Sequence, residues 1–356
     1  MNPLPQRRSL VSQTADILRE QMTTGVLSES LPGERELSAR LRVSRPTLRA
    51  ALELLRREGR LDVAQGQRRR IRQKLESTTK PKDTKRVVLL TPLPPHRMPP
   101  FVMFWVDELR QHLAEEGFDL EIQVSPIAEA SHPERQLERL IKDVPAAAWV
   151  LFLSSEPMQR WFAACALPCV VAGSCFPDVA LPSVDIDSQA TCRHSAGLFI
   201  TRKHSHIALL LPDSHTAGDQ ASEAGFREGA AVNGKIRTTV AHHDGSIASV
   251  CKKIDSLMSH ANPATAILVA RSAHALTTFT YLQRKGLRLP QDVSLISRDN
   301  DQFLDFVVPR ITRYACNPVT FARRVSRIVL QLTKEGSVSK RQVLLMPELI
   351  KGETTR

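Results

Sequence analysis

Apolar residues recur in short, regular patterns over the first 71 residues. Apolar side chains recur at helical spacing over 10–24, 34–41 and 44–58, which predicts three amphipathic helices. Residues 61–64 and 69–71 are candidates for two short strands around Gln65-Gly66-Gln67, and they predict a hairpin. Three helices followed by a hairpin is the order of elements in a winged helix-turn-helix domain.

From Val87 onward, short apolar runs alternate with amphipathic stretches long enough for helices. This alternation is typical of doubly wound α/β folds built on parallel sheets. The stretch of about 270 residues exceeds one typical sheet domain, so we expect two α/β lobes. Residues 72–86 are polar and poor in apolar groups, and they are interpreted as a linker. The expected strands lie within residues 87–90, 119–124, 147–153, 168–173, 206–211, 266–270 and 292–297.

The positive charge is concentrated at one end of the chain. Residues 1–86 contain 20 of the 49 Lys and Arg but only 10 of the 37 Asp and Glu, so they carry most of the net charge of +12. Such an asymmetry indicates a polyanionic partner for the N-terminal part. A membrane surface is the rival partner, but the basic residues do not form one amphipathic stripe.

Other classes of protein find little support in the composition. No apolar run approaches the roughly 20 residues of a membrane span, and the N-terminus lacks the apolar core of a secretory signal, so we expect a cytoplasmic protein without a membrane partner. The six cysteines match no zinc or redox spacing. Several histidines, including His204 and His206, invite a metal interpretation, but their spacing does not favour it. We therefore expect no metal, no cofactor and no catalytic residues.

Three motifs in the first part have a specific order and spacing. LPGERELS, VSRPTLRAAL and LLRREGRL begin at Leu31, Val43 and Leu54, and the glycine expected at the tip of the hairpin is Gly66. Together they resemble the winged-helix DNA-binding domain of the GntR family, over about residues 12–72. The family has serine where this chain has Gly33.

The resemblance implies that the third helix is the recognition helix. Such a helix presents its N-terminal residues to base edges in the major groove, where arginine can bind guanine or clamp a phosphate. Whether an individual arginine here contacts a base or a phosphate stays open. The residues expected to contact DNA are Arg35 on the preceding helix, Ser44, Arg45, Thr47 and Arg49 on the recognition helix, and Gly66, Gln67 and Arg68 at the tip of the hairpin.

The remainder of the chain contains several further motifs in a fixed order. PSVDIDSQATCRHSAGLFITRKHSHIALLL, AGFREGA, LQRKGLRLPQDVSLISRDN and VLLMPELI resemble, in that order, the sensor domain of LacI-family repressors. The GntR-type domain replaces that family's usual DNA-binding headpiece, as in chimeric repressors such as arabinose-responsive ones. The resemblance implies two lobes that the chain crosses three times, with an effector cleft at the carboxyl ends of the strands.

The two resemblances together predict the domain boundaries. We expect a winged-helix domain over 1–75, a linker over 76–86 and a sensor over 87–356. Within the sensor, lobe one is expected to comprise about 87–203 and 316–338, and lobe two about 204–315 and 339–356.

The predicted effector site includes one departure from the LacI family. Asp299 matches the family's effector-contacting aspartate, and Arg271 ends a strand where the family has a polar contact residue. The family's anchoring arginine is replaced by Ser222, which we expect to leave the opposite wall of the cleft short of a charge unless Arg271 or Arg298 compensates. Capping and a rim salt bridge are the alternative roles of Asp299 and Arg271. The proline-rich segment from Thr91 to Phe104 adds two candidate contacts, His96 and Phe101.

These features favour a homodimeric, ligand-responsive repressor. The dimer is expected to bind a palindromic double-stranded DNA operator and to sense a small polar effector, a sugar, in the cleft between the lobes. The alternative is a constitutive DNA binder whose degenerate sensor serves dimerisation or protein contacts. An enzyme fused to a DNA-binding domain is disfavoured, because no catalytic motif is present in the sequence.

Overall fold

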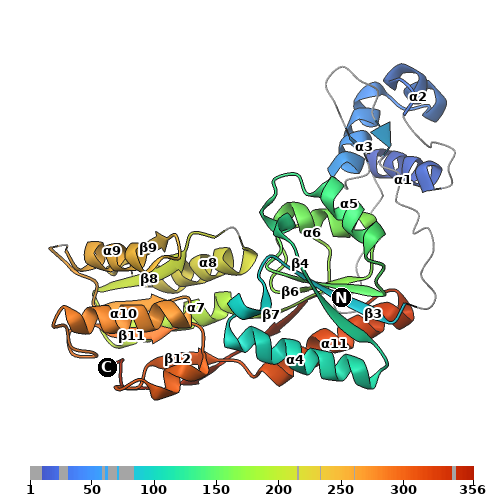
Figure 1. The fold of residues 1–356 in the computed structure, drawn as a ribbon. Helices are drawn as coiled ribbons and strands as arrows, with labels where there is room; N and C mark the ends of the chain where they lie inside the picture. The colour runs from blue at the N-terminus through green and yellow to red at the C-terminus, as the bar shows by residue number, and fades with distance from the viewer. Residues whose placement is uncertain are drawn as a thin grey trace, which may run out of the picture. The chain divides into compact units, whose positions relative to one another are not determined.

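The computed structural model contains two compact units (Figure 1). One comprises residues 1–82 and 160–166, and the other comprises residues 83–159 and 167–356. Each unit is described separately below. No described helix is long and apolar enough to cross a membrane. The structure describes residues 10–23, 31–57, 61–62, 70–71, 84–214, 216–232, 234–259, 261–338 and 342–356.

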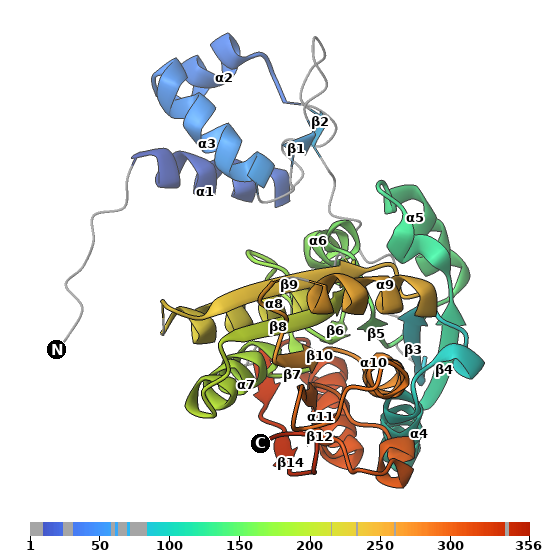
Figure 2. The same ribbon diagram turned by 90° about the vertical axis from the view of Figure 1, so that its left-hand side faces the viewer.

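The N-terminal unit contains three helices and a short two-stranded sheet (Figure 2). β1 and β2 pair antiparallel, with Leu61 opposite Ile71. Leucine side chains from all three helices, among them Leu18, Leu37 and Leu48, are fully buried in one core. The predicted helices and hairpin strands are therefore confirmed. The elements are α1 (Leu10–Thr23), α2 (Glu34–Leu41), α3 (Arg45–Arg57), β1 (Leu61–Asp62) and β2 (Arg70–Ile71).

Lobe one of the larger unit is a parallel sheet with helices on both faces (Figure 1). Trp105 of α4 and Phe321 of α11 pack in the core on one face of the sheet, and α5 and α6 cover the other face. The strands, in sheet order, are β13 (Gln342–Leu345), β7 (Ser183–Ile186), β6 (Cys169–Ala172), β5 (Ala148–Phe152), β3 (Arg86–Thr91) and β4 (Asp119–Val124). The helices are η1 (Pro95–Arg97), α4 (Pro100–Glu115), η2 (Pro126–Glu129), α5 (Glu134–Asp143), α6 (Glu156–Cys165) and α11 (Pro318–Glu335).

Lobe two repeats this architecture. The helices α9 and α10 pack on one face of its sheet, and α7 and α8 pack on the other. The strands, in sheet order, are β14 (Glu348–Ile350), β12 (Thr312–Ala315), β11 (Ser294–Ser297), β10 (Ala266–Val269), β8 (His206–Pro212) and β9 (Arg237–His243); β12 and β14 are antiparallel and the other neighbours are parallel. The helices are α7 (Ser188–Thr201), α8 (Ala217–Ala231), α9 (Ile247–Met258), α10 (Ser272–Arg284) and η3 (Gln302–Phe306). The predicted fold, a two-lobed doubly wound sensor with an N-terminal helix-turn-helix domain, is confirmed.

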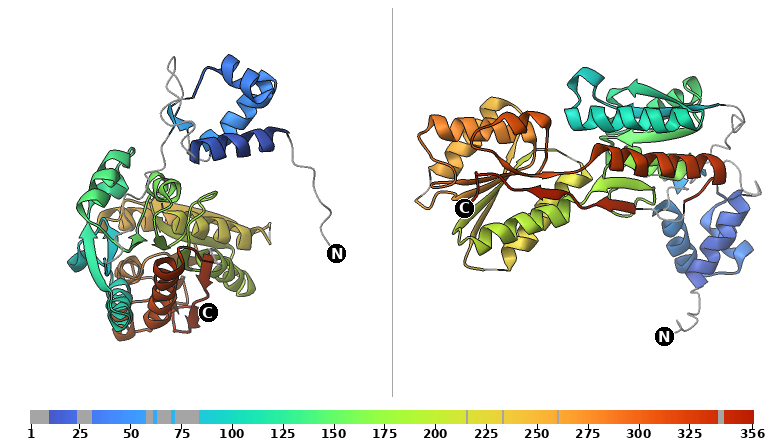
Figure 3. Two further views of the ribbon diagram at one scale, coloured as in Figure 1. Left: turned by 90° about the vertical axis from the view of Figure 1, so that its right-hand side faces the viewer. Right: turned by 90° about the horizontal axis from the view of Figure 1, so that it is seen from below.

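The chain crosses between the lobes three times, as expected, but two of the crossings lie elsewhere than predicted (Figure 3). The first follows β7, because Cys192, Ala196 and Phe199 of α7 are buried against the sheet of lobe two. The third follows β13, which pairs with β7 in lobe one. The expected boundaries at 203 and 338 were therefore wrong, while the expected boundary at 315 agrees with the crossing between β12 and α11.

Two glycines allow α7 and α8 to pack closely. A Cβ at Gly225 would lie 2.1 Å from the carbonyl oxygen of Gln189, and one at Gly229 would lie 2.6 Å from that of Arg193. Such separations are impossible for real side chains, so only glycine permits this approach. The close packing fixes the register of α8, which carries two residues of the candidate effector site.

Candidate DNA-binding and effector sites

The side chain of Ser44 caps the start of α3. The backbone N–H of Thr47 donates to Ser44 Oγ over 3.2 Å, and the two hydroxyl groups lie 2.8 Å apart. This cap satisfies one of the amide groups that a helix start leaves unpaired. It also leaves the first turn of α3 in a defined geometry at the solvent-exposed end.

Three of the four arginines expected to contact DNA, Arg35, Arg45 and Arg49, are exposed on α2 and α3. Arg49 Nε donates to Glu34 Oε2 over 2.7 Å, and the Arg49 side chain is 68% exposed. An ion pair this exposed contributes little to stability, so a phosphate can replace Glu34 at small cost. Gly66, Gln67 and Arg68 lie outside the described residues, and their expected role at the hairpin tip stays a prediction.

The carboxyl ends of β10 and β11 place two arginines and a carboxylate beside α8. Arg271 follows β10, and Arg298 and Asp299 follow β11. Asp219 of α8 contacts both arginines, since its carboxylate lies 2.7 Å from Arg271 Nη2 and 3.2 Å from Arg298 Nη1. Arg298 Nε donates to Asp299 Oδ1 over 3.0 Å, and Arg271 Nη1 lies 3.7 Å from Asp299 Oδ2. We call these four residues the charge network.

The charge network has a buried half and an accessible half. The side chains of Asp219 and Arg298 are 3% and 8% exposed, whereas those of Arg271 and Asp299 are 31% and 34% exposed. Burial alone would raise the pKa of Asp219, but Arg271 and Arg298 outweigh it and hold that pKa well below its usual range. Arg271 and Asp299 are therefore the members of the network that a ligand can reach.

Arg271 and Asp299 lie side by side in the structure; their contact with a ligand stays a prediction. For Ser222, the structure agrees with the alternative in which Arg298 compensates. Ser222 lies on α8 in the same lobe, and its hydroxyl accepts from Arg298 Nη1 over 2.5 Å. Arg298 thus supplies a guanidinium group next to Ser222. The serine therefore does not leave its surroundings without a positive charge.

Asp219, the carboxylate that both arginines share, is not among the site residues predicted from the sequence. Asp219 also accepts from Ser214 Oγ over 2.5 Å. One signal was available in the sequence: Asp219 precedes Ser222 by three residues, so both lie on one helix face. Two arginines at neighbouring strand ends also require a counterion.

The two candidates from the proline-rich segment do not join the charge network. The partly buried Phe101 packs against the core of lobe one, where its ring meets that of Phe321 edge to face with centroids 6.0 Å apart. His96 is exposed on η1, and no described hydrogen bond or ion pair connects it to the network. Their roles in ligand binding are therefore proposals without support from contacts.

Another carboxylate joins the two lobes close to the charge network. Asp301 Oδ1 accepts the backbone N–H of Phe101 over 3.3 Å, at the start of α4 in lobe one. Asp301 Oδ2 accepts from the hydroxyl of Ser272, at the start of α10 in lobe two. Ser272 follows Arg271, so the ligand-accessible residues are adjacent in sequence to a contact between the lobes.

The histidine pair that suggested a metal makes ordinary hydrogen bonds. His206 is buried and contacts the Asn262 carbonyl oxygen and Thr239 Oγ1, both at 2.9 Å. His204 Nδ1 lies 3.1 Å from Thr265 Oγ1. Among the described residues, no group of three or more His, Cys, Asp or Glu side chains is arranged to hold a metal ion.

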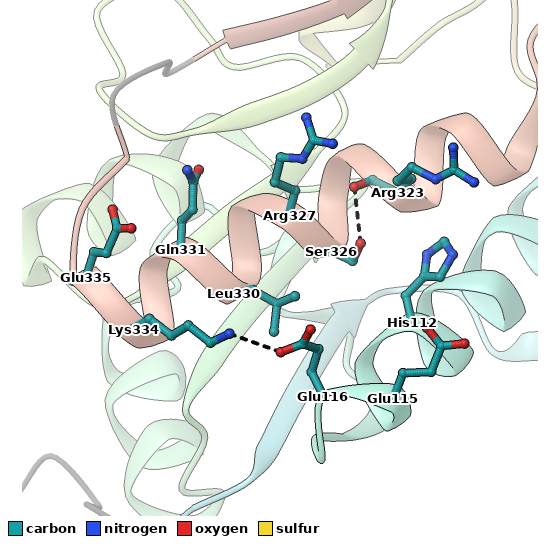
Figure 4. Close-up of a pocket in the computed structure, with 10 residues that line it drawn as sticks. All are labelled: His112, Glu115, Glu116, Arg323, Ser326, Arg327, Leu330, Gln331, Lys334 and Glu335. Carbon is teal, nitrogen blue, oxygen red and sulfur yellow. Dashed lines mark hydrogen bonds and ion pairs between the residues drawn. The ribbon is translucent and has the colours of Figure 1, made fainter.

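Two pockets lie apart from the charge network. The first, of about 480 Å³, runs between α4 and α11 of lobe one; charged side chains line it, and Lys334 Nζ pairs with Glu116 over 3.0 Å (Figure 4). The second, of about 570 Å³, lies between the segment after β6 and α8, with Phe176, Leu181 and Ala221 in its lining. Neither is lined by a member of the network.

The fold and these side chains define a two-part chain, with a helix-turn-helix domain followed by a two-lobed domain of the ligand-binding type. Residues 10–71 match the model of the bacterial regulatory proteins of the gntR family, and residues 196–355 match the model of the periplasmic binding protein-like domain. Both resemblances identified in the sequence are thereby confirmed.

Known proteins match the larger part of the chain. The HTH-type transcriptional repressor CytR of Escherichia coli K12 is 25% identical over 194 residues, which are 53% of this chain and 56% of CytR. The chain thus spans about half the length of the curated relative it matches. The solved structure of the transcriptional regulator CelR in complex with cellobiose has a TM-score of 0.68 at 18% identity and covers 98% of this chain and all of that one.

A LacI family transcriptional regulator from Enterococcus faecium, solved with bound ribose, has a TM-score of 0.63 at 16% identity. The match covers 76% of this chain and 98% of the Enterococcus faecium regulator. At these identities, the likeness to the solved structures concerns the fold alone.

Proposed function

We propose that this protein is a ligand-responsive transcription repressor that binds a palindromic DNA operator as a homodimer and senses a sugar. One observation carries the proposal. A helix-turn-helix domain with exposed arginines precedes a two-lobed domain in which Arg271 and Asp299 are accessible at the strand ends. Strand ends of this kind are where open α/β sheets bind ligands.

The DNA-binding part is assigned to residues 1–75, followed by a linker at 76–86 and the sensor at 87–356. Arg45 and Arg49 of the capped helix α3 provide two cations at the end that enters the major groove. Arg35 of α2 provides a further contact to the DNA backbone. A regulator of DNA works where the DNA is, so we assign the protein to the cytoplasm. The relative named above is a repressor, and no catalytic role is proposed.

Exposed apolar side chains support a dimer formed by the sensor. Phe306 and Val308 follow each other closely along the chain and are 87% and 86% exposed. Phe104 of α4 is also exposed, and the start of α4 is joined to the start of η3 by the contact between Phe101 and Asp301. Exposed apolar groups gathered over neighbouring elements are typical of protein interfaces. We propose that a second copy of this chain covers them.

The charge network favours an uncharged ligand with several hydroxyl groups. Arg271 Nη1 and Asp299 Oδ2 lie 3.7 Å apart, beyond hydrogen-bonding distance, so each retains bonding capacity toward a ligand. A hydroxyl group can accept from the guanidinium, and its neighbour can donate to the carboxylate. An anionic ligand would be repelled by Asp299, and a cationic one by Arg271. The sugars in the two solved relatives, cellobiose and ribose, are the first candidates to test.

The proposal is tested in two steps with the full-length protein. Selection from random double-stranded DNA should enrich a two-fold symmetric sequence, and the Arg45→Ala and Arg49→Ala double variant should lose its binding. A thermal-shift screen of ribose, cellobiose and related sugars should then raise the melting temperature of the wild type and leave that of Asp299→Ala unchanged. Specific DNA binding without any sugar response would instead support the constitutive DNA binder with a degenerate sensor.

A further inference from the structure

Two histidines meet at the same end of the lobe-two sheet as the charge network. His243 is the last residue of β9, and His274 lies in the first turn of α10, three residues after Arg271. Their ring centroids are 4.4 Å apart, and the ring planes are nearly perpendicular. His243 is buried and His274 is half-buried. The pair therefore adjoins the part of the sheet edge that we assign to the effector.

Backbone contacts determine which nitrogen of each ring carries the proton. The N–H of Gly245 donates to His243 Nδ1 over 3.1 Å, so Nδ1 holds a lone pair and Nε2 holds the proton. His274 Nε2 lies 3.2 Å from the carbonyl oxygen of Gly245, which can only accept, so this Nε2 holds the proton and Nδ1 the lone pair. Burial lowers the pKa of both rings, with His274 and Arg271 lowering that of His243 further, to about 4. Both rings are neutral at physiological pH.

The remaining nitrogen of each ring has no partner among the described residues. His243 Nε2 and His274 Nδ1 are both inaccessible to solvent and make no hydrogen bond. An unpaired buried polar group costs roughly 1–3 kcal/mol. One of the two atoms is a donor and the other is an acceptor, so a single group able to accept and to donate would satisfy both.

A hydroxyl group meets this requirement with a single oxygen atom. A carboxylate can accept from His243 Nε2 but cannot donate to His274 Nδ1, and an ammonium ion can donate but cannot accept. A metal ion would need a lone pair on His243 Nε2, where the proton resides. The pair thus favours a hydroxyl group over a carboxylate, an ammonium ion or a metal ion.

We propose that His243 and His274 form a hydroxyl-binding subsite of the effector site. His243 Nε2 donates to one hydroxyl oxygen of the effector, and the same hydroxyl donates to His274 Nδ1. This inference rests on the sugar-sensing function proposed above and extends it, because it assigns one hydroxyl of the sugar to this pair in addition to those at Arg271 and Asp299.

The test uses the full-length protein with ribose and cellobiose, and with the monodeoxy derivatives of whichever sugar binds. Affinities are measured by calorimetry for the wild type, His274→Phe and His243→Phe, because phenylalanine retains ring volume and removes the polar atoms. His242→Phe, at the preceding and exposed position of β9, is the matched control. We expect about a ten-fold loss of affinity in His274→Phe and in His243→Phe, and none in the control.

The deoxy sugars identify the source of the effect. One monodeoxy derivative should bind the wild type about ten-fold more weakly than the parent sugar does. The same derivative and the parent sugar should bind His274→Phe with equal affinity, because the two changes remove the same hydrogen bond. A further outcome is that the wild type and both phenylalanine variants bind the sugar with equal affinity while Asp299→Ala abolishes binding. That result would overturn the hydroxyl-binding subsite and leave the sugar-sensing function standing. The same conclusion follows if no deoxy sugar distinguishes the variants, because the pair then holds internal water only. Absence of binding by the wild type would overturn the sugar-sensing function together with this inference.

Discussion

Replacing Asp219 by asparagine would leave Arg271 and Arg298 without the carboxylate that both contact. Asparagine has the same shape, so the change removes charge and creates no cavity. The important partner is Arg298, because its side chain is 8% exposed and Arg271 is partly screened by solvent. Removing one member of a buried ion pair costs about 3–5 kcal/mol. Arg298 retains Asp299 at 3.0 Å, so we expect the lower end, about 3 kcal/mol.

The measurement is urea unfolding of the full-length protein, followed by circular dichroism at pH 7. Asp213→Asn is the matched control, since Asp213 is exposed just after β8, and it should change the free energy of unfolding by less than about 0.5 kcal/mol. Adding Arg298→Met to Asp219→Asn should recover part of the lost stability. The second change removes the buried guanidinium charge, which in Asp219→Asn has only the carboxylate of Asp299 as its partner. If Asp219→Asn is no more destabilising than the control, the charge network does not exist in solution.

The difference in unfolding free energy between the wild type and Asp219→Asn should depend on pH. The folded-state pKa of Asp219 lies below its unfolded value, which is about 4. Its stabilisation is therefore fully present above pH 4 and is lost as the pH falls through the folded-state pKa. The difference in unfolding free energy between wild type and Asp219→Asn should shrink below pH 4, and a constant difference would contradict the assignment.

Three further predictions concern the other parts of the chain. Arg49→Ala should weaken DNA binding and reduce the slope of log affinity against log salt by about one, as expected for one lost phosphate contact; an unchanged affinity and slope would exclude Arg49 from the interface. Phe306→Glu should convert the dimer to monomers in sedimentation experiments, while Val232→Glu, equally exposed, should not. The buried ring of His204 has a pKa lowered to about 4 by burial first and by Arg356 and Arg202 next. The unfolding free energy should thus fall by up to about 3 kcal/mol between pH 6.5 and 4, and His204→Gln should flatten this profile.

The elements of the fold with a strong local pattern were predictable. The spacing of apolar residues located the three helices of the N-terminal unit, and the continuous apolar runs located most of the buried strands, because both patterns follow from which side chains must leave water. The first and third lobe crossings were not predictable in this way. β7 and β13 are four-residue strands of mixed polarity, and α7 contacts a sheet that begins only after it in the chain.

The candidate effector site was predictable only in part, because its ion pairs join residues that are far apart in the sequence. Arg271 and Asp299 each end a recognisable apolar strand, so their shared edge follows from the topology of parallel sheets. The pairing of Arg298 with Asp219 does not follow from local pattern, because the two residues are 79 positions apart in the sequence. A serine at position 222 suggested a missing charge, whereas the structure supplies a guanidinium from β11 in its place.

The central claim, that a sugar bound by the sensor controls DNA binding, is tested most directly by one titration. Fluorescence anisotropy of the selected operator is measured with the wild type and with Asp299→Ala, with and without a saturating concentration of the sugar that shifts the melting temperature. Coupling of typically 1–3 kcal/mol predicts a change of about 5- to 150-fold in the DNA affinity of the wild type and none in Asp299→Ala. A wild-type affinity for the operator that stays the same with saturating sugar would contradict the account.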